Sequence, residues 1–175
     1  MSKTKQIVLT GLFIALGLVL PMAFHSIPNA GSIFLPMHIP VLLCGLVCGP
    51  WFGLGCGALT PLLSSVVTGM PPAAILPGML CELAVYGLTA GLLMRFLPIA
   101  NRPAHLYVSL IGAMLAGRVV SGIVNALIFR VGQYSMQIWL TASFVTALPG
   151  IAIQIVLIPI IALALQKARL AELPA

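Results

Sequence analysis

The sequence predicts an all-helical integral membrane protein with six transmembrane helices. Of the 175 residues, 61% are hydrophobic and 6% are charged, whereas soluble domains carry about 25% charged residues. The mean hydropathy is +1.20. Apolar stretches that approach the roughly 20 residues needed to span a bilayer recur along the chain. We therefore expect a single transmembrane domain over residues 1–175, with short connections between its helices.

The basic residues predict the orientation of this domain. Six of the eight occur at three places: Lys3 and Lys5 before the first apolar stretch, Arg95 and Arg102 around one connection, and Lys167 and Arg169 after the last stretch. Six helices put all three places on one side, and the positive-inside rule makes that side cytoplasmic. The net charge of +6 then faces anionic membrane lipid rather than nucleic acid. We expect a multi-pass protein of a prokaryotic plasma membrane.

The first apolar stretch, residues 7–24, is predicted to be a retained helix. It is longer than the apolar core of a signal peptide, and Phe24-His25-Ser26 offers no small-residue cleavage site. The Pro, Asn and Gly content of residues 25–32 predicts a loop after it.

The second helix is predicted to be short. It covers about residues 37–49 and stops at Gly49-Pro50, so at 1.5 Å per residue it is only about 18 Å long, less than the ~30 Å of the hydrocarbon core. The third helix spans residues 51–67, with a kink at Pro61. We expect the glycines at every fourth position, Gly45, Gly49, Gly53 and Gly57, to pack helices together inside the bundle.

Three further helices are predicted over residues 74–96, 105–131 and 138–167. Pro149 and Pro159 interrupt the apolar pattern of the last one, so its start is the least defined boundary.

The chain lacks the residue patterns of an enzyme. Its only acids are Glu82 and Glu172, so it has no carboxylate pair for acid–base chemistry. It also has no glycine-rich phosphate loop followed by Lys-Ser or Lys-Thr. We expect no catalytic residues, no cofactor and no bound metal.

Glu82 and Arg118 are the ionisable residues expected deepest in the membrane. Such charges are costly and usually face a bundle interior or a wet cavity. They could form a buried ion pair that fixes helix packing, or one or both could contact a ligand.

Further polar residues are expected at a similar depth, and a cluster of this kind suits a small-molecule site. They are Tyr86, Asn125, Arg130, Gln133, Gln137, Trp139, Thr146 and Gln154. His25 and His38 bracket the first outer loop. Each histidine is either an interfacial hydrogen-bonding residue or a ligand of a metal or tetrapyrrole.

Gly11 and Ala15 lie four residues apart on one face of the first helix. Small residues at this spacing allow close helix approach. The spacing fits both a docking face for another membrane protein and packing within this chain.

The run FLPMHIPVLLCGLVCGP over residues 34–50, its continuation WFGLGCG over residues 51–57, and Ala116-Gly117-Arg118 resemble the substrate-binding membrane subunits of energy-coupling factor transporters. The resemblance extends over the whole chain. It implies a subunit that binds a vitamin or similar micronutrient near the outer surface and then associates with a membrane coupling protein and two ATPase subunits. ATP hydrolysis would occur in those partners.

The resemblance also implies roles for particular residues. Gly11 and Ala15 match a small-residue pair that docks the coupling protein, with glycine replacing the usual first alanine. Residues 25–35, with His25 and Asn29, would form one gating loop, and residues 68–72 the other. The ligand would contact the outer halves of the last three helices. It remains open among folate, pantothenate, riboflavin, a queuosine precursor, cobalamin and haem.

Two other functions fit the composition. A stand-alone secondary transporter or channel would transport by itself and would use Glu82 for ion coupling. An assembly subunit without a ligand would use the polar cluster for folding alone.

Overall fold

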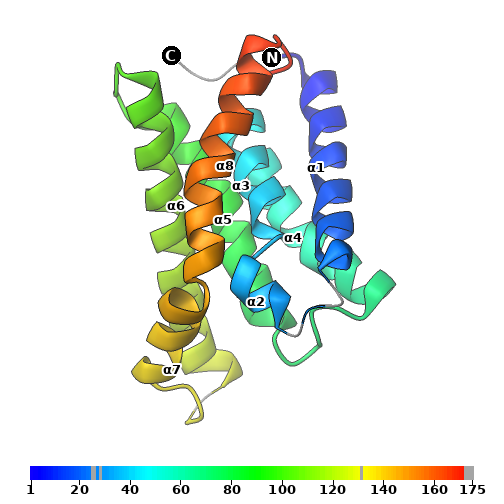
Figure 1. The fold of residues 1–175 in the computed structure, drawn as a ribbon, viewed down its shortest axis with the longest axis vertical. Coiled ribbons are helices and arrows are strands. Elements are labelled where there is room, and N and C mark those ends of the chain that lie inside the picture. The colour runs from blue at the N-terminus through cyan, green and yellow to red at the C-terminus, as the bar shows by residue number, and fades with distance from the viewer. Residues whose placement is uncertain (25–26, 28, 131, 172–175) are drawn as a thin grey trace.

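The computed structural model describes residues 1–24, 27, 29–130 and 132–171 as a bundle of helices (Figure 1). The elements are α1 (Lys3–Ala23), α2 (Ala30–Phe34), α3 (His38–Cys48), α4 (Pro50–Thr68), α5 (Leu76–Phe96), α6 (Arg102–Val124), the π-helical η1 (Asn125–Phe129), α7 (Met136–Leu140), the π-helical η2 (Thr141–Thr146) and α8 (Leu148–Lys167). The described residues contain no β-strand.

Six helical stretches in the described residues are long and apolar enough to cross a membrane. They are α1, Ala30–Cys48, α4, α5, Arg102–Phe129 and α8. The predicted fold class, an all-helical protein with six membrane-spanning helices, is therefore confirmed. The short second helix is also present, since α3 itself has 11 residues and reaches span length only together with α2.

Helix α1 begins and α8 ends at the same end of the bundle (Figure 1). The Nζ atom of Lys5 donates a hydrogen bond to the backbone oxygen of Arg169 at 2.8 Å. The positive-inside rule assigns this end to the cytoplasm. The opposite end, which carries α2 and α7 in Figure 1, is called the outer end below.

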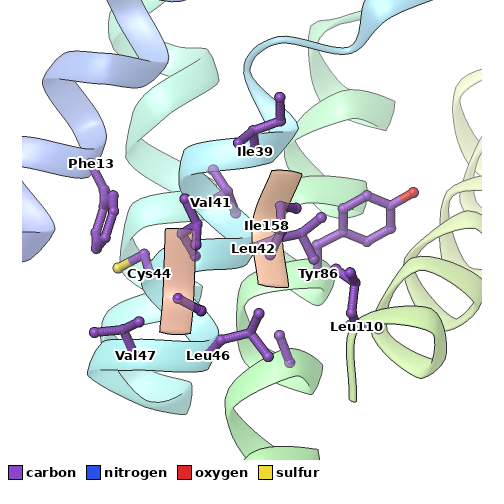
Figure 2. Packing of buried hydrophobic residues seen from close by; sticks show 14 of the residues in the cluster. Phe13, Ile39, Val41, Leu42, Cys44, Leu46, Val47, Tyr86, Leu110 and Ile158 are labelled. Carbon is purple, nitrogen blue, oxygen red and sulfur yellow. The ribbon is translucent and has the colours of Figure 1, made fainter. Parts of the chain in front are cut away.

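Helix α3 occupies the centre of the bundle, and all eleven of its residues are buried. Figure 2 shows Phe13 of α1, Tyr86 of α5 and Ile158 of α8 around it. A helix that is apolar on all sides is stable only when other helices enclose it. Its neighbours α1, α4, α5, α6 and α8 all contact it.

Glycines bring the backbones of α3, α4 and α5 together. A Cβ atom added at Gly45 or Gly53 would collide with the backbone oxygen of Gly87, and one added at Gly57 would collide with the backbone of Leu83. In lipid, such close contact replaces the hydrophobic drive that packs helices in water. The predicted internal packing is thus confirmed for these three glycines. Gly49 instead forms the turn between α3 and α4, with φ +94°.

The segment predicted as one helix over residues 138–167 is divided in the structure. It comprises part of α7, then η2, then α8. Pro149 lies in the first turn of α8, a position where its missing N–H breaks no helical hydrogen bond. Within the predicted loop 25–32, residues from Ala30 onward begin the short helix α2.

Candidate ligand-binding site

Four polar side chains come from four different helices and hold the same position relative to the buried core. Each lies one helical turn toward the outer end from a buried core residue of its own helix. The pairs are His38 and Leu42 on α3, Glu82 and Tyr86 on α5, Arg118 and Met114 on α6, and Gln154 and Ile158 on α8. We call His38, Glu82, Arg118 and Gln154 the polar layer. The apolar core lies directly on its cytoplasmic side.

Glu82 is the acidic centre of this layer. Its Oε1 atom accepts a hydrogen bond from the Tyr86 hydroxyl at 3.0 Å and lies 3.9 Å from Nε2 of His38. The His38 and Tyr86 rings meet edge to face, with centroids 5.4 Å apart. Figure 2 shows the Tyr86 hydroxyl at the edge of the apolar cluster. Glu82 is thus held by two neighbours that themselves pack on the core.

Arg118 lies near this acid without pairing with it. It is close enough to interact with the charge of Glu82, yet no ion pair within 4.0 Å joins these two described residues. The neighbouring Gly117 explains the proximity, because a Cβ atom there would collide with the Tyr86 ring. The sequence allows two arrangements, a direct Glu82–Arg118 ion pair or contact of these residues with a ligand. The structure does not show the direct ion pair.

Several atoms of the polar layer are buried without a hydrogen-bond partner. They are Nδ1 of His38, Nη2 of Arg118, and both Nε2 and Oε1 of Gln154. The three residues are 3%, 3% and 0% exposed. Leaving one such group unsatisfied costs about 1–3 kcal/mol, and native proteins contain few of them. The layer therefore has free hydrogen-bonding capacity that a bound molecule can use.

An aromatic pair covers Arg118. Nε1 of Trp139 donates to the backbone oxygen of Arg118 at 3.0 Å, and a Cβ atom at Gly122 would collide with the same indole. The Trp139 and Phe144 rings meet edge to face, with centroids 5.5 Å apart. The Arg118 guanidinium lies 5.5 Å from the Phe144 centroid, a cation–π distance. Sequence reasoning missed Phe144, because an aromatic residue in an apolar stretch carries no distinguishing signal.

Of the remaining predicted ligand residues, those that the structure describes are not members of the polar layer. Asn125 donates to the backbone oxygen of Ser121 at 2.8 Å. The Arg130 guanidinium lies 6.0 Å from the Tyr134 ring. Asn29 is exposed and precedes α2 with φ 58°. His25 falls outside the described residues.

The described residues include no group of three or more His, Cys, Asp or Glu side chains placed to hold a metal ion. Cys44, Cys48 and Cys56 are buried free thiols. Cys44 contacts the hydroxyl of Thr10 with its sulfur at 3.6 Å, so these thiols take part in the packing of α1, α3 and α4.

Gly11 and Ala15 lie on an exposed face of α1. A Cβ atom added at Gly11 would meet nothing within 4 Å. The buried residues of this helix, Phe13 and Gly17, are elsewhere on its surface. Packing within the chain therefore does not account for the small residue at position 11.

The fold and the polar layer define a multi-pass membrane protein with a candidate site for a small polar molecule, and comparison with known families agrees. The family described as "ECF transporter, substrate-specific component" matches residues 5–162. The chain therefore belongs to the substrate-specific components of energy-coupling factor (ECF) transporters. Proteins of this kind are substrate-binding subunits rather than enzymes, and they associate with an ECF module of membrane and ATPase subunits. No curated protein and no solved structure gave a significant match.

Proposed function

We propose that this chain binds a vitamin or related micronutrient in the polar layer and delivers it through an ATP-driven coupling module in a prokaryotic plasma membrane. The observation that carries the proposal is the set of unpaired buried atoms on His38, Arg118 and Gln154. Buried polar groups are normally satisfied, and a site for a small molecule combines apolar walls with a few convergent polar groups. Here the walls are the core around Tyr86 and the Trp139–Phe144 pair.

The exposed face around Gly11 and Ala15 supports the second half of the proposal. Close helix approach in a membrane favours small residues, and this face of α1 is not used by the chain itself. We propose it as the contact for the membrane coupling protein, whose two associated ATPase subunits would supply the energy.

The binding half is tested by mass spectrometry of small molecules extracted from the detergent-purified protein. A double variant, Glu82→Gln with Arg118→Ala, is the test protein, and Arg102→Ala, at an exposed position at the cytoplasmic end, is the matched control for loss of a positive charge. A stoichiometric micronutrient present in the wild type and in Arg102→Ala, and absent from a folded double variant, is expected. A wild-type protein that carries none, even after incubation with a vitamin mixture, would contradict the proposal and favour an ion-coupled transporter or a structural subunit.

A further inference from the structure

The positive charge of Arg118 lacks a full complement within the polar layer. Its Nη2 atom is buried without a partner, and the sequence contains only two acids, Glu82 and Glu172. Glu82 is not within ion-pair distance of Arg118 and already accepts from Tyr86. Because a buried charge is costly unless it is paired, the complementary group on a bound molecule is an anionic oxygen.

A cationic molecule fits this layer poorly. It would place a second positive charge near Arg118, and the single acid available to it, Glu82, already has Tyr86 and His38 beside it. An uncharged molecule would leave Nη2 of Arg118 without a charge-assisted hydrogen bond, since Glu82 acts on the guanidinium only from beyond 4.0 Å. Phe144 contributes a cation–π contact to Arg118, which is weaker than a buried charge-assisted hydrogen bond.

Gln154 adds a second requirement for the chemistry of the bound molecule. Its side chain is fully buried, and both its donor Nε2 and its acceptor Oε1 are unpaired. A carboxamide offers two N–H donors and one oxygen acceptor side by side. The group that satisfies both kinds of atom at once is another amide edge, as found in an amide, a lactam or a cyclic urea.

We propose that the ligand is an anionic molecule that also carries an amide-type group. This inference rests on the proposed function. The anionic oxygen binds Nη2 of Arg118, and the amide edge pairs with the carboxamide of Gln154. The two residues come from α6 and α8, which contact each other. The class includes carboxylic acids with an amide, lactam or cyclic urea, and it excludes cations and uncharged ring systems.

The test uses the full chain in detergent, with calorimetry and thermal-shift assays on six probes. Two matched pairs keep the amide-type group and change only the acid: pantothenate with pantothenol, and biotin with biotinol. Riboflavin supplies a lactam without an anion, and thiamine supplies a cation. We expect one of the acids to bind, with its alcohol weaker by about 10- to 100-fold, the range for a hydrogen bond to a charged group.

Variants assign the two contacts. Arg118→Gln should weaken the acid to the level of its alcohol and leave the alcohol unchanged. Gln154→Leu should weaken both by the same factor, so that the acid-to-alcohol ratio is preserved. Gln166→Leu, on the same helix toward the cytoplasmic end, is the matched control and should bind as the wild type does. Arg118→Lys, which keeps the charge, replaces Arg118→Gln if that variant does not fold, and should retain preference for the acid.

The possible failures are distinguishable. Equal binding of an acid and its alcohol, or preferred binding of riboflavin or thiamine, overturns the ligand class and leaves the proposed function standing. Binding of none of the six probes by a folded wild-type protein overturns this inference, and the proposed function falls with it only if mass spectrometry also finds no micronutrient in the purified protein.

Discussion

The Tyr86 hydroxyl donates a hydrogen bond to Oε1 of Glu82 at 3.0 Å. Both residues lie on α5, four positions apart, and the Tyr86 ring is buried in the apolar core. One side chain thus connects the core to the acid of the polar layer. This connection limits how Glu82 can move when a ligand binds.

Removing the hydroxyl tests this connection. Tyr86→Phe keeps the ring in the core and deletes one hydrogen bond, which should cost about 1 kcal/mol of stability. We expect ligand affinity to fall roughly three- to tenfold, because Glu82 is no longer held in place. Calorimetry with the ligand, together with thermal unfolding in detergent, measures both effects. Unchanged affinity in a folded variant would show that the hydroxyl does not position the acid.

The fluorescence of Trp139 should report ligand binding. The chain has two tryptophans, and Trp51 is 73% exposed on α4, at the cytoplasmic end of that helix. In a Trp51→Phe variant, the remaining indole is bonded to the backbone of Arg118, so binding at Arg118 should change its emission saturably. A Trp139→Phe variant that retains Trp51 should show no change. A change in emission that appears only in the variant that retains Trp51 would instead place the ligand at the cytoplasmic end of the bundle and contradict the proposed site.

Close packing at Gly87 should be essential for stability. A Cβ atom there would collide with the backbone of Gly53, whereas one at Gly55 would meet nothing within 4 Å. Overpacking costs about 1–3 kcal/mol when neighbours can adjust, and a helix backbone adjusts poorly. We expect Gly87→Ala to lower the thermal midpoint clearly and Gly55→Ala to leave it unchanged or higher. Equal midpoints for the two variants would contradict the packing described for α4 and α5.

Bulky side chains on the exposed face of α1 should prevent assembly and spare ligand binding. The larger side chains of Gly11→Leu and Ala15→Leu prevent close approach of the coupling protein to α1. We expect the association of this chain with the coupling module to weaken about tenfold or more. Val66→Leu, at an exposed position of α4, is the control. Co-purification with the coupling module measures assembly, and calorimetry measures binding. Full assembly of both α1 variants would rule out this face as the contact.

Much of the fold is predictable because the bilayer imposes it. Apolar length, basic residues and the Gly49-Pro50 break determine the number, orientation and lengths of the spans. Likewise, every member of the polar layer could be found in advance, since polar residues are rare in these spans and therefore conspicuous.

The partners within the site could not be predicted in the same way. Depth in the membrane left open whether Glu82 pairs with Arg118 or contacts a ligand, and it did not indicate that Glu82 contacts Tyr86 and His38. The rotation of each helix depends on glycine contacts such as Gly117 against the Tyr86 ring, which a single sequence does not reveal. Similarly, Asn125 bonds to its own helix at Ser121, a local alternative that polarity alone does not distinguish from a ligand contact.

We propose that this chain binds its cargo and depends on a separate ATP-driven module to move it. The most direct test measures uptake of the radiolabelled ligand into liposomes that contain the wild-type chain alone, or the chain with the coupling module and ATP. We predict stoichiometric binding in both cases and uptake only with the module and ATP. Uptake by the chain alone, driven by an ion gradient and abolished by Glu82→Gln, would contradict the claim and identify a secondary transporter.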